Sequence, residues 1–254
     1  MAHVLVLCYH AVSSTWDSEL AVTPSQLEWQ VSRLLRLGYR PATYHQAVTA
    51  PPARYTLSVT FDDGYRSMRE QAYPVLSRLG VPATVFVPTD YVGQDSPMSW
   101  DGIENWLGTP DEHELCPMDW DDLRWLTWRG WEIGSHTMSH PYLPSVEQPD
   151  LDRELVESKA RLAEELGRPC RSIAYPYGGV IEQVAEATEA AGYETAAALW
   201  HPVRDHDRFT WPRVAIYRDD TPWRFAAKAA IRLRQFQGGI GRSAGRTAYT
   251  SPGG

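Results

Sequence analysis

Cysteine is scarce in this chain of 254 residues. Cys8, Cys116 and Cys170 are odd in number, lie far apart and form no CxxC pair. This spacing suggests neither a disulfide framework nor a cysteine-ligated zinc site. We therefore expect three buried free thiols, which fits reducing surroundings.

Long apolar runs and an excess of positive charge are also missing. No stretch approaches the ~20 apolar residues of a membrane-spanning helix. The N-terminus has no basic segment, and its apolar run at 4–7 is too short for a signal peptide. We expect a cytoplasmic protein, although a secreted chain trimmed of its signal peptide would have the same sequence. The net charge of −8 argues against nucleic acid as a partner.

The chain does contain short apolar, β-rich runs that alternate with amphipathic stretches. Such alternation predicts βα units around a parallel sheet, whose strands are buried on both faces. One core of this size suits an α/β barrel, with an open doubly wound sheet as the alternative. The expected strands are residues 4–9, 55–61, 83–87, 131–135, 172–174, 195–198 and 214–216.

The predicted helices carry their own start and stop signals. Thr23-Pro24-Ser25-Gln26 is typical of a capping box, and the helix that it begins ends at Gly38. Three further helices, each followed by glycine, are expected at 66–79, 151–166 and 181–191.

The barrel is expected at 1–237, and two regions of the chain lack the alternation. Residues 88–118 form a long loop, which in a barrel would lie on the catalytic face if it follows a strand. Residues 238–254 are rich in Gly, Ser and Arg and are predicted to be disordered. The stretch 223–236 is a basic amphipathic helix that either packs on the barrel or touches an anionic membrane.

Two adjacent carboxylates follow one predicted strand, in Thr60-Phe61-Asp62-Asp63-Gly64. Ligands of parallel α/β folds bind at the carboxyl ends of strands. Adjacent aspartates repel each other unless a cation lies beside them. A metal meets this need, with one aspartate as its ligand and the other taking a proton from water at the metal. The alternative is a turn in which aspartate caps a helix.

Two histidines follow another predicted strand, in Gly134-Ser135-His136-Thr137-Met138-Ser139-His140-Pro141. Imidazoles four residues apart lie on one face of a helical turn and can share one ion. Two histidines and one carboxylate leave positions open for water, as in a catalytic site. Hydrogen-bonded loop histidines are the alternative.

Together the two motifs resemble those of the polysaccharide deacetylase family (NodB homology, carbohydrate esterase family 4). TFDDG at 60–64 and HTMSH at 136–140 carry the resemblance, which covers roughly residues 4 to 216. It implies a distorted (β/α)7 barrel and zinc-dependent hydrolysis of acetamides of N-acetylated amino sugars, with cobalt or nickel also suited to such a site. It also implies Asp62 as general base and Asp63, His136 and His140 as metal ligands.

A third segment, Ala174-Tyr175-Pro176-Tyr177-Gly178, departs from the family pattern. The family often has arginine where this chain has Ala174. Arg213 is the candidate for the missing cation, with a surface arginine as the alternative. The backbone N–H of Tyr177 is the candidate donor to the developing oxyanion.

The late histidine that acts as general acid in the family has no counterpart after His206. Leu7-Cys8-Tyr9-His10 resembles instead the start of the circularly permuted subgroup that acts on poly-N-acetylglucosamine. His10 is therefore the candidate acid, with a structural histidine as the alternative.

The expected partner is an N-acetylated glycan or glycoside. Tyr65, Pro176, Trp100 and Trp211 are the candidate substrate contacts, since sugar rings stack on aromatic side chains, although core packing explains most tryptophans. Two other functions stay open: the same machinery acting on a formyl group or cyclic imide, and a non-catalytic carbohydrate-binding barrel.

Overall fold

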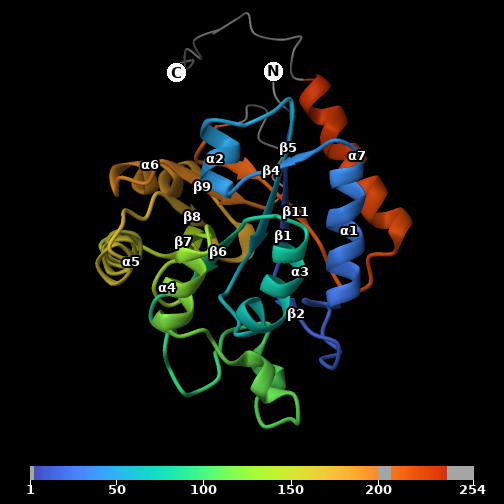
Figure 1. Ribbon diagram of the computed structural model, residues 1–254. Helices are drawn as coiled ribbons and strands as arrows, with labels where there is room; N and C mark the ends of the chain where they lie inside the picture. Colours follow the sequence, from blue (N-terminus) through green and yellow to red (C-terminus); the bar gives the residue numbers. More distant parts are fainter. Residues whose placement is uncertain (1–2, 200–206, 239–254) are drawn as a thin grey trace, which may run out of the picture.

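The computed structural model describes residues 3–199 and 207–238, and its strands form a nearly closed parallel barrel (Figure 1). The pairing order is β10-β9-β8-β7-β6-β5-β1-β11, and every pair is parallel. The strands of this path are β1 (His3–Tyr9), β5 (Tyr55–Phe61), β6 (Ala83–Val87), β7 (Glu132–Ser135), β8 (Ser172–Ala174), β9 (Thr195–Ala198), β10 (Trp211–Pro212) and β11 (Val214–Ala215).

One short stretch of chain joins the two edges of this sheet. β10 pairs with β9, and β11 pairs with β1. Only Arg213 lies between β10 and β11 in the sequence. The backbone N–H of Arg213 donates to Ala198 O (3.0 Å), and that of Ile216 donates to Cys8 O (2.9 Å). Residues 211–215 thus act as one strand, which gives the seven strand positions of the predicted (β/α)7 barrel.

Apolar side chains form two layers of core around the strands. Val4, Val6, Phe86, Ala174 and Ala197 fill the inside, which α2 (Tyr44–Thr49) covers at the N-terminal end with Tyr44 and Ala47. A larger cluster packs the outer strand faces against the helices. Both strand faces are buried, which explains the near-continuous apolar runs in the sequence.

Helices surround the barrel, and most bounds agree with the predicted ones (Figure 1). The predicted single helix at 66–79 is wrong in one respect, because it begins as a π-helix that packs Met68 and Ala72 into the core. The remaining elements are α1 (Pro24–Arg36), η1 (Met68–Ala72), α3 (Tyr73–Arg78), α4 (Trp120–Trp128), α5 (Asp150–Leu166), α6 (Glu182–Ala190), α7 (Pro222–Gly238), the 3-10 turns η2 (Glu104–Trp106), η3 (Glu112–Leu115), η4 (Leu143–Ser145) and η5 (Pro176–Gly178), and the short strands β2 (Ala11–Val12), β3 (Ala21–Val22) and β4 (Arg40–Pro41).

The last helix packs on the barrel beside α1 (Figure 1). Phe225 is buried and its ring lies 5.9 Å from that of Trp29, while Lys228 pairs with Asp220 at 2.6 Å. Part of the apolar face of 223–236 is therefore used in packing, whereas a membrane contact would need it exposed. No described helix is long and apolar enough to cross a membrane. Of the tail predicted to be disordered, Gly238 ends α7 instead, and 239–254 lie outside the described residues.

The capping box of α1 is present as predicted. Thr23 Oγ1 accepts from the Gln26 N–H (3.1 Å), and Gln26 Oε1 accepts from the Thr23 N–H (2.8 Å). We predict that Thr23→Ala lowers the free energy of unfolding by about 1 kcal/mol, because one helix donor loses its partner. Urea unfolding measures the loss. Thr43→Ala is the control, since Thr43 occupies the same position in α2 without a capping hydrogen bond, and an equal loss there would contradict the prediction.

Candidate active site

The alternation of side chains along two strands brings the catalytic candidates to one end of the barrel. Val4 and Val6 face the inside, so Cys8 and then His10 continue the same row at the carboxyl end of β1. β1 and β5 are in register with Cys8 beside Thr60, which sets His10 next to Asp62. The Asp62 N–H donates to Tyr9 O (3.0 Å) and extends this pairing past the strand end.

Left-handed backbone conformations occur at four non-glycine residues of the described chain, and all four lie around this end. They are Asp63, Thr137, His140 and Tyr177, with φ values between 58° and 70°. Such residues cost free energy and concentrate at functional sites. The predicted helical turn between the histidines is therefore wrong, because Thr137 and His140 adopt φ values of 69° and 65°.

Three side chains form a group that could hold a metal ion. Asp63 Oδ1 lies 3.4 Å from His136 Nε2 and 3.3 Å from His140 Nε2, and all three residues are buried. His136 Nδ1 lies 2.7 Å from Ala174 O, a contact that makes Nδ1 the donor and leaves Nε2 free to ligate. Two imidazoles and a carboxylate with open positions suit a catalytic zinc ion, so the residues fit the expected cofactor.

A buried ion pair holds the second aspartate. Arg213 donates from Nη1 to Asp62 Oδ1 (2.6 Å) and from Nη2 to Asp62 Oδ2 (2.7 Å), and the arginine side chain is fully buried. Arg213 also donates to Thr60 Oγ1 (3.1 Å). The structure thus gives Asp62 a bidentate cation from the barrel seam, where Ala174 offers none.

The surroundings of the two aspartates and the two histidines shift the pKa of each side chain. Burial alone would raise the pKa of Asp62, but the charge of Arg213 and then that of His136 hold it below its ordinary value. The pKa of Asp63 is lowered further, since hydrogen bonds from His136 and His140 outweigh burial. The pKa of His140 is lowered, mainly by burial, whereas that of His136 is raised, because Asp62 and Asp63 overcome the effect of burial. Both aspartates are therefore ionised at neutral pH.

The loop at 88–118 follows β6 and lies at the lower end of the view in Figure 1. It forms hydrogen bonds with both the aspartate turn and the histidine turn. At its start the N–H groups of Thr89 and Asp90 donate to Thr137 O (3.1 Å) and Met138 O (3.0 Å). At its end the Met118 N–H donates to Gly64 O (2.9 Å). The loop therefore lies on the catalytic face, as expected, and ties the aspartate turn to the histidine turn.

A cavity of about 180 Å³ opens over these groups. Its lining residues are His10, Glu19, Leu20, Asp62, Asp63, Trp100, Asp101, Gly102, Ile103, His136, His140, Tyr177, Gly178 and Leu199. Trp100 stacks on the His140 ring at 4.2 Å, and the Tyr177 ring meets it edge-on at 4.8 Å.

Three of the predicted substrate contacts do not line this cavity. Tyr65 is fully buried with its ring 5.8 Å from that of Trp16, because the turn after Gly64 points it into the core. Pro176 is buried in η5, and Trp211 packs against the inner core of the barrel. Trp100 and Tyr177 do line it, and Tyr177 is 44% exposed, so its side chain is open to a ligand.

Glu154 of α5 is a site residue that the sequence analysis missed. Its carboxylate accepts from the N–H groups of Met138 (2.7 Å) and Ser139 (3.1 Å) and from Ser139 Oγ (2.6 Å). These bonds hold the turn between the two histidines. In the sequence Glu154 is one of several glutamates of an amphipathic helix, and only its position on the same face as Leu151, Leu155 and Leu162 could have distinguished it.

With this geometry in place, the comparisons with known proteins identify the family. The family model described as polysaccharide deacetylase matches residues 49–196, more than half of the chain. This chain belongs to the polysaccharide deacetylase family. That assignment confirms the resemblance carried by the two motifs. The nearly closed parallel barrel described above is the fold that the resemblance implies.

Two curated relatives share low sequence identity with this chain. Protein YxkH of Bacillus subtilis is 26% identical over 76% of this chain and 63% of its own length. The poly-beta-1,6-N-acetyl-D-glucosamine N-deacetylase of Staphylococcus aureus is 25% identical over 75% of this chain and 65% of its own length. This chain therefore spans less than two thirds of the curated relatives that it matches.

Solved structures share the fold over most of this deacetylase-family chain. IcaB from Ammonifex degensii aligns with a TM-score of 0.73 and 25% identity over 92% of this chain and 98% of its own. The Streptococcus pyogenes deacetylase PplD, solved with acetate, aligns with a TM-score of 0.73 and 19% identity over 89% of this chain and 97% of its own. The second likeness concerns the fold alone.

The buried ion pair gives the first prediction for the site. We expect Arg213→Met to lower the free energy of unfolding by about 3–5 kcal/mol, because it leaves the Asp62 carboxylate buried without a counter-ion. Urea unfolding of metal-free protein measures this loss.

The double variant Asp62→Asn/Arg213→Met should regain part of the loss, since neither charge then remains. Arg124→Met is the control, because its partner Glu165 is partly exposed and such pairs contribute about 1 kcal/mol or less. Independent, additive losses in the double variant would contradict the ion-pair account.

Glu154 gives a second prediction. Glu154→Gln should weaken zinc binding by about 10- to 100-fold, because its amide cannot accept every donor of the turn that orients His136 and His140. Equilibrium dialysis of metal-free protein against zinc measures the affinity. Glu157→Gln, an exposed glutamate on the same helix, should bind zinc as the wild type does. Equal affinities for the two variants would contradict the proposed support.

Proposed function

We propose that this chain is a metal-dependent N-deacetylase of N-acetylated amino sugars. In this reaction water cleaves the amide C–N bond and yields acetate and a free amino sugar. The observation that supports it best is the placement of Asp62 beside the group of Asp63, His136 and His140, with His10 on the wall of the same cavity. A base, a metal site and an acid thus meet where a glycan can enter.

The cation proposed for Asp63, His136 and His140 is zinc, with cobalt or nickel as alternatives; when bound, it supplies Lewis-acid polarisation of the acetamide carbonyl. Asp62 accepts the proton of the attacking water, and Arg213 orients its carboxylate for this transfer. The N–H of Tyr177 donates to the oxygen of the carbonyl as negative charge develops there. His10 donates a proton to the amine nitrogen as the C–N bond breaks.

The substrate we favour is a polymer of N-acetylglucosamine. The Staphylococcus aureus relative is named for its action on poly-beta-1,6-N-acetyl-D-glucosamine, and IcaB shares the fold over nearly its whole length. The stacking surface of Trp100 beside His140 is suited to a sugar ring held over the metal site. Residues 101–103 of the same loop line the cavity and are placed to select the acyl group.

Amine release tests this proposal. The substrates are β-1,6-linked N-acetylglucosamine oligomers, monomeric N-acetyl glycosides and N-formyl analogues, each assayed with chelator and with added zinc. We expect zinc-dependent release from the oligomers and a loss of about 10²-fold or more in kcat for Asp62→Asn, because the base is removed.

His136→Ala should lose both zinc and activity, whereas His113→Ala, an exposed histidine of the 88–118 loop, should keep both. Faster release of formate than of acetate would show that the enzyme acts on N-formyl rather than N-acetyl groups. An absence of amine from every amide, with zinc bound, would overturn the deacetylase proposal.

A further inference from the structure

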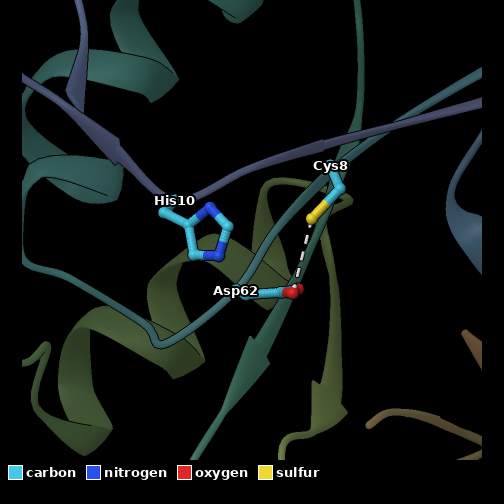
Figure 2. A group of neighbouring side chains, drawn as sticks. All are labelled: Cys8, His10 and Asp62. Carbon is cyan, nitrogen blue, oxygen red and sulfur yellow. Dashed lines mark hydrogen bonds between the residues drawn. The ribbon is translucent and has the colours of Figure 1, made fainter. Parts of the chain in front are cut away.

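Cys8 lies at the catalytic end of the barrel, and the mechanism above gives it no task. Its thiol donates to Asp62 Oδ2 at 3.4 Å, and the residue is fully buried. Figure 2 shows Cys8, His10 and Asp62 pointing toward one another from the ends of β1 and β5. A sulfur, an imidazole and a carboxylate thus converge beside the metal group of Asp63, His136 and His140.

These three side chains lie close enough together to share a metal ion. One ligand atom from each of Cys8, His10 and Asp62 lies within 4.8 Å of the other two, in a group that shares no residue with the first. Zinc bonds of about 2.0–2.3 Å place neighbouring ligand atoms about 3.4–3.7 Å apart, so the 3.4 Å between sulfur and carboxylate already fits. His10 Nδ1 is buried without a hydrogen-bond partner among the described residues.

An ion can reach this group through the cavity. His10 and Asp62 are both part of the cavity wall, and the buried Cys8 thiol contacts Asp62 at 3.4 Å. Thiolate, imidazole and carboxylate are the ligands that zinc combines in proteins, and cobalt accepts the same set.

We propose that Cys8, His10 and Asp62 form a second divalent-cation site, whose occupation by excess zinc inhibits the enzyme. Binding exchanges the thiol proton for the ion: the S–H bond breaks, a sulfur–metal bond forms and the proton leaves to solvent. The ion then occupies lone pairs of Asp62 and His10, which are the base and acid of the proposed function. The inhibition rests on that proposed function, whereas the binding does not.

This second site is weaker than the first because of Arg213. The guanidinium already holds both oxygens of Asp62, at 2.6 and 2.7 Å, and its positive charge opposes a nearby cation. Asp63 instead meets two histidines. Zinc therefore fills the Asp63 site first and the Cys8 site only in excess.

Cobalt titration of the metal-free full chain tests the binding without any substrate, since cobalt bound to thiolate shows a charge-transfer absorption that other ligands lack. We expect a first equivalent without this band and a second, weaker equivalent with it. Cys8→Ser keeps a hydrogen bond to Asp62 but removes the sulfur, so the band should vanish. Cys170→Ala removes another buried thiol and should leave the band unchanged.

Zinc inhibition of amine release is the second measurement. Each variant is compared with its own rate at one equivalent of zinc, and the inhibition midpoint of Cys8→Ser should move to about tenfold higher zinc or beyond, because a ligand is lost. A wild-type titration that ends at one equivalent without the band overturns the proposal, as does a band that survives in Cys8→Ser. The band with no amine release from any substrate supports the second site and contradicts only the deacetylase function.

Discussion

One buried ion pair, between Asp62 and Arg213, links the closure of the barrel to the proposed catalytic base. A carboxylate without water is tolerated only with a counter-charge and satisfied oxygens. Arg213 supplies both from the single residue between β10 and β11, where the two edges of the barrel meet. The segment that closes the barrel therefore also orients the carboxylate of the proposed base.

Local patterns in the sequence were enough to predict a parallel sheet of βα units, because strands buried on both faces are continuously apolar. The choice of a barrel over an open doubly wound sheet came from the family resemblance of the two motifs. The predicted bounds of β5, β6, β8 and β9 are those observed. The π-helix at 68–72 and the left-handed residues of the histidine turn were not predictable in the same way. The histidine turn is held by contacts with distant parts of the chain, such as Glu154 with Met138 and Thr89 with Thr137.

In the candidate site, too, some residues stand in local sequence motifs, whereas others come together only through the fold. Asp62, Asp63, His136 and His140 stand in two short motifs, so their types and spacing were visible. Arg213 is 151 residues from Asp62, and its link to the base follows from barrel closure, which no local pattern records. The sequence also indicated a buried Cys8, but only the register between β1 and β5 places its sulfur on the Asp62 carboxylate.

The adjacent aspartates Asp62 and Asp63 meet different partners at this end of the barrel, an arginine for one and two histidines for the other. Asp62 continues the inward row of β5, where Arg213 neutralises it and fixes its carboxylate. Asp63 takes a φ of 70°, and its carboxylate meets His136 and His140 instead. Because the charge of Arg213 opposes a cation at Asp62, the proposed function places the metal ion at Asp63 and leaves Asp62 as the base. The backbone turn at Asp63 thus assigns different tasks to two chemically identical neighbours.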